Sequence, residues 1–341
     1  MNTLHAAYIC YMQKEIVVSG IRPTGFLHLG NYFGAMRNYL RMQDDYTSFF
    51  FVANWHALTT HTDAASIAQS VQRVIAEYIA CGLDPEKAIL YVQSDIPEIA
   101  ELYLLLNMLA YKGELEKTAS FKEKIRKHTE NINAGLLTYP VLMAADILIH
   151  KAVKVPVGKD QEQHLEMVRN FAHRFNHRYG NCFPEPHPFN FGNQLTKILS
   201  LDGQGKMSKS EHELATVYLV DEDEVIRKKI MKAKTDAGPG TPNTPKPDYI
   251  ENLFVLMRLV STPEAVQYFE NAYNNCAIRY GDMKKQLAED MVQFIAPIRT
   301  KAAAIQKDTT YISAIRNIGS EKARANASKT IQEVRKKMMG L

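Results

Sequence analysis

The sequence predicts an α/β protein, with a doubly wound parallel sheet in the first part of the chain and only helices in the last part. Three observations predict this fold. Short apolar runs that are typical of buried strands alternate with stretches of helical spacing in the first half. Prolines and glycines mark the turns, and beyond the proline-rich segment 237–248 only helical spacing remains. Such a sheet binds ligands at the carboxyl ends of its strands.

Bulk composition is that of an ordinary soluble protein. The 341 residues suffice for two domains, and the formal net charge of +4 does not by itself indicate nucleic-acid binding. The four cysteines form no C-x-x-C pair, which argues against a metal site and favours a reducing compartment. Because no apolar run is long enough to cross a bilayer, we expect a cytoplasmic protein without membrane contact.

The first strand, turn and helix are expected over residues 15–40. Residues 1–14 are expected to be an N-terminal extension, and Met12 is a candidate start because the first strand already begins near Glu15. A β-branched run then leads into a Pro-Thr-Gly turn, and apolar residues recur at helical spacing from Leu29 to Leu40.

The start of this helix is a candidate phosphate site. The first turn of a helix offers unpaired backbone N–H groups and a partial positive charge. His28 and Asn31 lie three residues apart and share a face, and Gly30 between them lets a nucleotide approach the backbone. A strand–turn–helix that binds no phosphate stays the alternative for this stretch by itself.

Further strands and helices alternate after the first helix. Residues 48–53 and 88–93 are predicted to be buried strands, with a helix over 67–81 between them. A fourth strand at 155–157 precedes another helix. His56 lies just past a strand end, where it is either a structural residue or a ligand contact.

Two carboxylates have both a structural and a functional interpretation. Asp146 interrupts the apolar helical stretch 135–148, and burial of an unpaired Asp costs several kcal/mol. It therefore lies at a helix end or the surface, or it awaits a donor from a ligand. Asp160 follows Gly158 at a strand-to-helix turn, where it either caps the next helix or holds a ribose hydroxyl.

Lysines concentrate in two segments. The basic run 121–127 is most simply a solvated face. Lys206 and Lys209 follow the glycine-spaced segment 202–205 and are separated by small polar residues, which suits a cationic clasp for phosphates better than a helix face. A solvated loop is the alternative.

The last part of the chain is predicted to be helical throughout. Residues 221–234 place acids first and bases last, as the helix dipole favours, and 287–305 keep one apolar face. The terminal helix is expected at about 321–339. No catalytic constellation is visible in this half, which is an RNA-docking module, a dimer scaffold or a cap on the first domain.

Six motifs together carry a resemblance to class I aminoacyl-tRNA synthetases, and within them to the bacterial tryptophanyl-tRNA synthetases. The similarity runs from about Ile16 to the C-terminal helix. The motifs are Pro-Thr-Gly at 23–25, Gly-Asn-Tyr at 30–32, Leu-Leu-Thr-Tyr-Pro at 136–140, Met-Ala-Ala-Asp-Ile at 143–147, Gly-x-Asp-Gln at 158–161 and Lys-Met-Ser-Lys-Ser at 206–210.

The resemblance implies a two-step reaction. Tryptophan attacks the α-phosphate of Mg-ATP to give tryptophanyl-adenylate and pyrophosphate, and the aminoacyl group then moves to the 3′ end of tRNA(Trp). It implies Mg²⁺ with ATP but no protein-bound metal, and a homodimer. It divides the chain into an N-terminal extension (1–14), a Rossmann-like catalytic domain that binds ATP and tryptophan (15–210), a helical anticodon-binding domain (211–320) and a C-terminal helix that packs back on the chain (321–341).

The resemblance also implies roles for individual residues. Catalysis falls to Lys206, Lys209, Lys124, His28 and Asn31. ATP binding falls to Arg22, Pro23, Thr24, Gly30, Asn31, Gly158, Lys159, Asp160, Ile198, Lys206, Met207, Ser208, Lys209 and Ser210. Tryptophan binding falls to Asp146, Tyr139, Met143, Ile147, Gln161 and His56, with Asp146 accepting the indole N–H.

The sequence departs from the family pattern at three places. Arg22 stands where many members have Gln, Asn54-Trp55 replaces a more usual Asp-Gln, and Val18 stands where an aromatic residue is frequent. The alternatives are a tyrosyl-tRNA synthetase, a catalytically idle paralogue that senses tryptophan or binds RNA, and a small nucleotidyltransferase.

Overall fold

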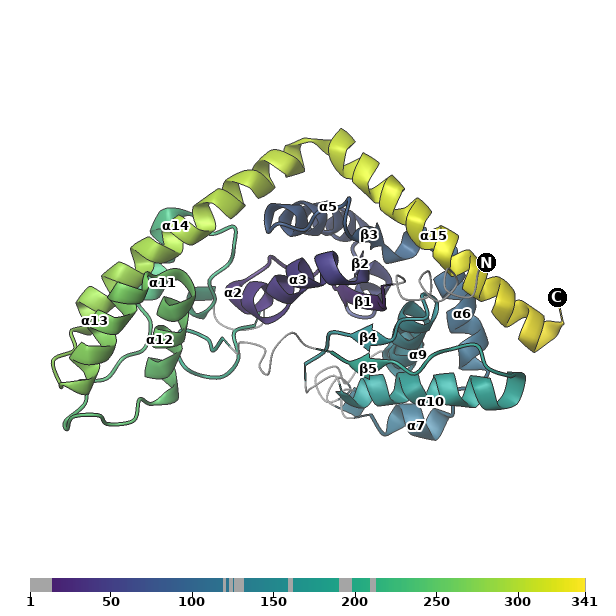
Figure 1. The fold of residues 1–341 in the computed structure, drawn as a ribbon, viewed down its shortest axis with the longest axis horizontal. Helices are drawn as coiled ribbons and strands as arrows, with labels where there is room; N and C mark the ends of the chain where they lie inside the picture. The colour runs from purple at the N-terminus through teal and green to yellow at the C-terminus, as the bar shows by residue number, and fades with distance from the viewer. Residues whose placement is uncertain are drawn as a thin grey trace, which may run out of the picture.

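The computed structural model describes residues 14–118, 121–122, 125, 132–158, 162–189, 198–208 and 213–340. Their centre is a parallel sheet of five strands in the order β3-β2-β1-β4-β5 (Figure 1). The strands are β1 (Ile16–Ile21), β2 (Thr47–Val52), β3 (Ile89–Val92), β4 (Lys154–Val155) and β5 (His187–Pro188). The predicted α/β fold with a parallel sheet is confirmed.

Helices cover both faces of the sheet. In the first half they are α2 (Leu29–Asn31), α3 (Arg37–Asp45), α4 (Asn54–Leu58), α5 (Ala64–Ala80), α6 (Pro97–Asn107), α7 (Lys112–Glu116), α9 (Ala134–Leu148) and α10 (Glu162–Tyr179), with the short turns η1 (Tyr32–Met36) and η2 (Gln93–Asp95). In the second half they are η4 (Glu213–Ala215), α11 (Asp223–Met231), α12 (Asp248–Val260), α13 (Pro263–Asn274), α14 (Tyr280–Lys307) and α15 (Thr309–Met339).

Alternation along each strand divides the core in two. On β2, Phe50 belongs to one cluster with Tyr39 of α3 and Tyr78 of α5. Its neighbour Phe49 points to the opposite face and belongs to a second cluster, which also contains residues of α6, α9, α10 and α15. Because both faces are buried, the strand has no polar side, and this explains the continuous run of phenylalanines.

The predicted first helix is present as three joined pieces. α2, the π-helical turn η1 and α3 follow one another without a break, and the helix runs to Asp45. Leu29, Phe33 and Met36 are buried, as their helical spacing predicts.

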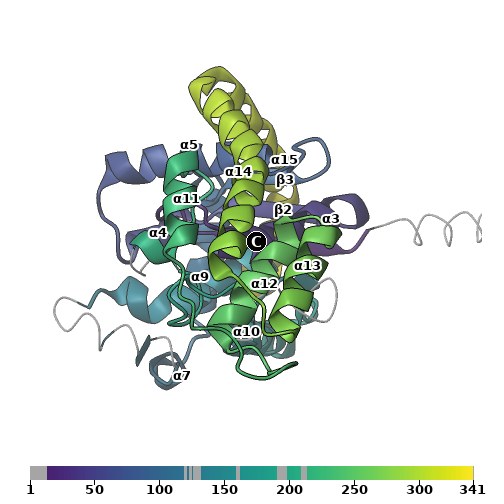
Figure 2. The ribbon, with the colours of Figure 1, turned by 90° about the vertical axis from the view of Figure 1, so that its left-hand side faces the viewer.

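The terminal helix begins earlier than predicted. α15 starts at Thr309, and not near Glu321, directly after α14 ends at Lys307. The Asp308 side chain accepts a hydrogen bond from the Tyr311 backbone N–H at 2.9 Å and so caps the helix. The two helices form the inverted V of Figure 1, and Figure 2 views α11, α12 and α13 gathered beside α14.

α15 returns to the sheet and covers the edge strand β3. The buried face of α15 includes three small residues: Gly319, Ala323 and Ala327 follow at four-residue intervals, and the two alanines are fully buried. A Cβ atom built on Gly319 would lie 1.8 Å from the carbonyl oxygen of Leu90 on β3. The absence of a side chain at this position therefore permits the helix to reach the strand backbone.

Ion pairs attach α15 to the sheet end and to α6. Arg316 contacts both carboxylate oxygens of Asp95 at 2.5 Å, and Arg335 contacts both of Glu101 at 2.6 and 2.5 Å. Paired N–H···O bonds of this kind fix orientation as well as distance. The C-terminal helix thereby holds the turn that follows β3.

We expect Gly319→Ala to destabilise the protein by about 1–3 kcal/mol, because the added methyl group overlaps the Leu90 carbonyl. This outweighs the better helix propensity of alanine. Gly281→Ala in α14 is the control, since a Cβ there meets nothing within 4 Å, and it should stabilise by up to about 1 kcal/mol. Urea unfolding measures both, and a stabilised Gly319→Ala would contradict the close packing of α15 on β3.

His150 joins α9, the sheet and α15 inside the second cluster. Its ring stacks on Phe49 with centroids 4.1 Å apart, and its Nδ1 lies 2.8 Å from Asn326 Oδ1 on α15. Its Nε2 lies 2.9 Å from the Tyr91 hydroxyl. Burial lowers the pKa of His150 to about 4, despite the opposing hydrogen bond to Asn326, so the ring is neutral at neutral pH.

The folded protein should therefore lose stability in acid through His150. The unfolded histidine binds a proton near pH 6.5 and the folded one near pH 4, so the lost stability grows to roughly 3 kcal/mol as pH falls through this window. Urea unfolding between pH 6.5 and 4 should show this slope reduced in His150→Gln. His177→Gln, at an exposed histidine, is the control and should keep the slope of the wild type. An unchanged slope in His150→Gln would contradict the buried neutral ring.

Candidate functional site

Three strand ends meet at one edge of the sheet. β1, β2 and β3 are parallel, so the residues that follow them lie side by side. Arg22 follows β1, the start of α4 with His56 follows β2, and Gln93 follows β3. α9 packs against the face that belongs to the second cluster and brings Asp146 to this edge.

Asp146 is a buried carboxylate with two donor partners. Its side chain is 1% exposed. His56 Nε2 lies 2.8 Å from Oδ2, and Gln93 Nε2 lies 2.8 Å from Oδ1 and 3.0 Å from Oδ2. Since an ionised carboxylate only accepts hydrogen bonds, both nitrogens act as donors. Of the interpretations that the sequence allows, a surface Asp is wrong because the carboxylate is buried, although Asp146 does lie in the last turn of α9.

Burial and hydrogen bonding act on the Asp146 pKa in opposite directions. Loss of solvent raises the pKa of Asp146 above its ordinary value, whereas the contacts with His56 and Gln93 lower it. His56 is thus a direct partner of the carboxylate. Gln93 is absent from the predicted site residues. Its only sequence signal is that a polar residue follows the apolar run of β3 directly.

An apolar cavity of about 340 Å³ lies between α4, α6 and α9. Trp55 and Thr59 line one side, Tyr103 another, and Tyr139 a third. The Tyr139 hydroxyl lies 2.5 Å from Nε2 of His164, a buried residue of α10.

Tyr139 and Asp146 lie two turns apart on α9 and so share a face of that helix. Met143 lies between them and is half-buried, while Ile147 is buried in the second cluster. Among the residues that the structure describes, the cavity lining includes neither Met143, Asp146 nor Ile147. The carboxylate thus lies deeper along the same helix than the open cavity.

The first helix and the lysine loop lie against each other. A Cβ atom on Gly30 would lie 3.0 Å from the His28 ring and 3.3 Å from the Met207 carbonyl oxygen. The Asn31 side chain caps the helix start, where its Oδ1 accepts from the His28 backbone N–H at 3.2 Å. Two motifs that are far apart in sequence therefore share one site.

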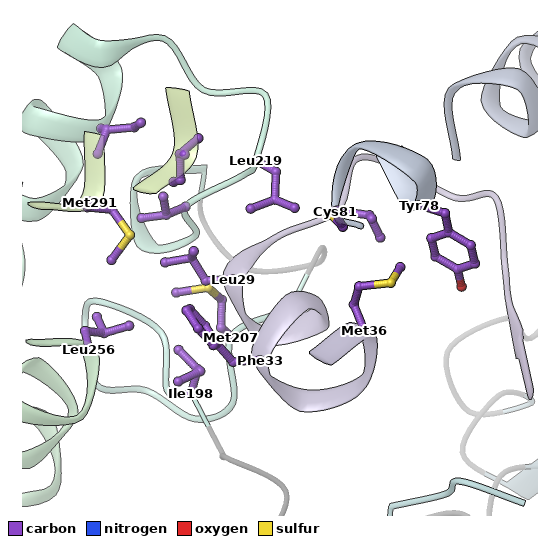
Figure 3. Packing of buried hydrophobic residues seen from close by; sticks show 14 of the residues in the cluster. Leu29, Phe33, Met36, Tyr78, Cys81, Ile198, Met207, Leu219, Leu256 and Met291 are labelled. Atoms are coloured by element: carbon purple, nitrogen blue, oxygen red, sulfur yellow. The ribbon is translucent and has the colours of Figure 1, made fainter. Parts of the chain in front are cut away.

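Buried apolar residues hold the lysine loop in place. Met207 and Ile198 are buried with Leu29 and Phe33 of the first helix, as Figure 3 shows. The Met207 backbone N–H donates to the Ile198 carbonyl at 2.9 Å. Lys206, between this anchor and the solvent, is exposed. The backbone of the loop is thus anchored, while the Lys206 side chain lies in solvent.

The turn after β1 lies beside the strand ends. Arg22 is half-buried, and its Nη2 donates to Thr60 Oγ1 at 2.8 Å. Burial lowers the pKa of Arg22 below its usual range. Pro23 is buried, and the Thr24 backbone N–H donates to the Arg22 carbonyl at 2.8 Å. Gly158 is the last described residue of the turn after β4. In the lysine loop, the Ser208 carbonyl accepts a hydrogen bond from Thr216 Oγ1 at 3.0 Å.

Six predicted site residues lie outside the described part of the chain: Lys124, Lys159, Asp160, Gln161, Lys209 and Ser210. Within the described residues, no group of three or more His, Cys, Asp or Glu side chains could hold a metal ion. Over the same residues, no helix has the length and apolar character to span a membrane.

Comparison with known proteins identifies the class. Residues 12–296 match the family of class I tRNA synthetases for tryptophan and tyrosine (W and Y). The chain belongs to this family. Its relatives there include the tryptophan–tRNA ligase of Porphyromonas gingivalis, which is 58% identical over 322 residues, 94% of this chain and 98% of that protein. The tryptophan–tRNA ligase of Helicobacter pylori is 41% identical over 333 residues, 97% of this chain and 100% of that one.

Solved structures agree with the sequence relatives. The tryptophanyl-tRNA synthetase of Campylobacter jejuni complexed with ADP and tryptophan superposes with a TM-score of 0.85 at 32% identity, and the match covers 96% of this chain and 100% of that chain. A tyrosyl-tRNA synthetase from Aeropyrum pernix reaches 0.66 at 18% identity over 96% of this chain and 93% of that one, a likeness in fold alone. The resemblance to tryptophanyl-tRNA synthetases that the motifs indicate is thereby confirmed.

Proposed function

We propose that this protein activates tryptophan with Mg-ATP and transfers it to the 3′ end of tRNA(Trp). The observation that carries the proposal is the buried Asp146 carboxylate, which is surrounded by donors and lies on the helix that lines an apolar cavity. The similarity to tryptophan–tRNA ligases, which extends over nearly the whole chain at 58% and 41% identity, supports the same reaction.

Asp146 suits an indole better than a phenol. An ionised carboxylate only accepts, and the indole N–H only donates, whereas a tyrosine hydroxyl does both. A buried polar group also rejects an analogue that leaves it unpaired far better than an apolar slot does. Met143 and Ile147 flank the ring in this proposal, Tyr139 and Gln161 hold the ammonium group, and His56 keeps Asp146 oriented.

Phosphates lie at the start of the first helix. His28, Gly30 and Asn31 face them, and Lys206, Lys209 and Lys124 approach from the other side. The remaining ATP contacts are Arg22, Pro23, Thr24, Gly158, Lys159, Asp160, Ile198, Met207, Ser208 and Ser210. The packing of Met207 against Gly30 supports this arrangement, because it keeps the lysine loop within reach of the helix start.

Catalysis of the first step is then electrostatic. The attacking group is already a carboxylate, so no general base is needed. Negative charge builds on the pyrophosphate as it leaves, and lysine ammonium groups stabilise it. Mg²⁺ enters with ATP and supplies further positive charge at the phosphates. Orientation of the two substrates provides the rest of the rate.

The helical part docks tRNA in this proposal. Residues 211–320 form the anticodon-binding domain. Beyond them, the exposed Lys322, Lys329 and Lys336 lie at two-turn spacing on one face of α15, where they contact the tRNA phosphates. The protein works in the cytoplasm, where its tRNA substrate is.

Tryptophan-dependent ATP–pyrophosphate exchange tests the first step. Lys206→Met should lower kcat by about a hundredfold with little change in the KM for tryptophan, because the ammonium group acts on the leaving group. Lys232→Met removes an exposed lysine at the end of α11 and should leave exchange unchanged. Exchange that depends on tyrosine, or the absence of exchange with both tryptophan and tyrosine, would overturn the proposed function.

A homodimer is the proposed assembly, and α6 offers a face for it. Leu104 and Met108 are 55% and 67% exposed and lie one turn apart. Leu104→Glu with Met108→Glu should shift the protein to monomers in sedimentation velocity, because two charges would be buried in the interface. Tyr268→Glu, at an equally exposed apolar residue of α13, is the control. A double variant that still sediments as a dimer would exclude this face.

A further inference from the structure

We propose that Gln93 determines the specificity of this site by holding Asp146 as an oriented acceptor for one ligand N–H. The inference rests on the proposed function, in which Asp146 receives the indole N–H. It concerns a residue that contacts Asp146 and not the substrate, so Gln93 is a positioning residue.

The chemistry of its neighbours sets which way the Gln93 amide faces. Gln93 is fully buried, and its Oε1 accepts from the Trp55 backbone N–H at 3.0 Å. A backbone N–H can only donate, so the amide oxygen must face Trp55. The amide NH₂ group then faces Asp146 and donates to it at 2.8 and 3.0 Å. Reversing the amide would bring two acceptors together on one side and two donors on the other.

This arrangement leaves one oxygen of Asp146 less occupied than the other. Oδ2 contacts both His56 and Gln93, whereas among the described residues Oδ1 contacts Gln93 alone. Each carboxylate oxygen accepts about two hydrogen bonds, so Oδ1 keeps room for one more donor. A donor amide also favours the ionised carboxylate, which presents no O–H of its own. The site thus selects a ligand group that donates.

The turn that carries Gln93 is held on three sides. Ser94 exchanges two hydrogen bonds with the Asn54 side chain, at 2.8 and 3.1 Å. Asp95 is bound by Arg316 and by Ser320 of α15, the latter at 3.1 Å. Consecutive residues of η2 are therefore fixed by α4, α9 and α15. A donor on such a rigid turn can define the direction of the carboxylate, and not only neutralise it.

The test compares tryptophan with 3-benzothienylalanine, in which a sulfur atom replaces the indole N–H. ATP–pyrophosphate exchange gives kcat/KM for each, and we expect the wild type to favour tryptophan by at least about a hundredfold. Gln93→Met keeps the length of the side chain and removes the donor. We expect its preference to fall below about tenfold, chiefly through the KM for tryptophan, with the KM for ATP unchanged.

Two further variants complete the design. Gln93→Leu also removes the donor and leaves an apolar side chain, so it should lose the preference as well, and it serves if the Met variant does not fold. Gln43→Met is the matched control, because Gln43 is also buried, accepts from the Asp84 backbone N–H at 2.9 Å and donates to the Gly82 carbonyl at 3.4 Å, far along the sequence from Asp146. Its preference for tryptophan should equal that of the wild type.

The outcomes separate the inference from the function beneath it. Loss of preference in both Gln93 variants, with Gln43→Met unchanged, supports the inference. An equal fall in kcat/KM for the two amino acids at Gln93 would overturn it and leave the residue a purely structural one, while the proposed function stands. A wild-type protein without tryptophan-dependent exchange would overturn the proposed function, and the inference with it.

Discussion

Burial of a negative charge is costly unless donors surround it, and the Asp146 carboxylate meets this requirement by drawing on two strand ends at once. His56 comes from the segment after β2 and Gln93 from the turn after β3. These segments are neighbours only because the strands are parallel and adjacent. The site therefore depends on the sheet topology, and the sheet in turn leaves little freedom to the residues that follow its strands.

The C-terminal helix contributes to the same site from outside it. α15 can approach β3 because Gly319 carries no side chain against the Leu90 carbonyl. Arg316 then binds Asp95, two residues beyond Gln93. The helix thus stabilises the turn on which the donor to Asp146 lies, although it is the last element of the chain and contributes no residue to the cavity lining among those described.

The first helix and the lysine loop are held together in a different way. There the packing is apolar: Met207 and Ile198 are buried beneath the loop together with Leu29 and Phe33 of the first helix. Polar groups at the helix start and the exposed Lys206 lie above this packed layer. The apolar anchor fixes the backbone of the loop, while the Lys206 side chain remains exposed.

Sequence periodicity was sufficient for the parallel sheet, the first helix and the helical second half, because strands and helices repeat with different periods and prolines and glycines interrupt both. It also singled out Asp146, since a carboxylate in an apolar helix needs a partner. The start of α15 was missed although Asp308 is a good cap, because α15 as a whole is weakly amphipathic and its buried face includes small residues such as Gly319 and Ala323.

By itself, the sequence determined the fold class and the family, since these follow from local periodicity and from motifs whose members are close in the chain. Only the tertiary structure decided which groups satisfy Asp146, because Gln93 and His56 come from separate segments that strand pairing brings together. The same holds for Gly319 and for the contact between Gly30 and Met207. At Gly319 and at Gly30 another segment's backbone approaches closely, and this distance exists only once the chain has folded.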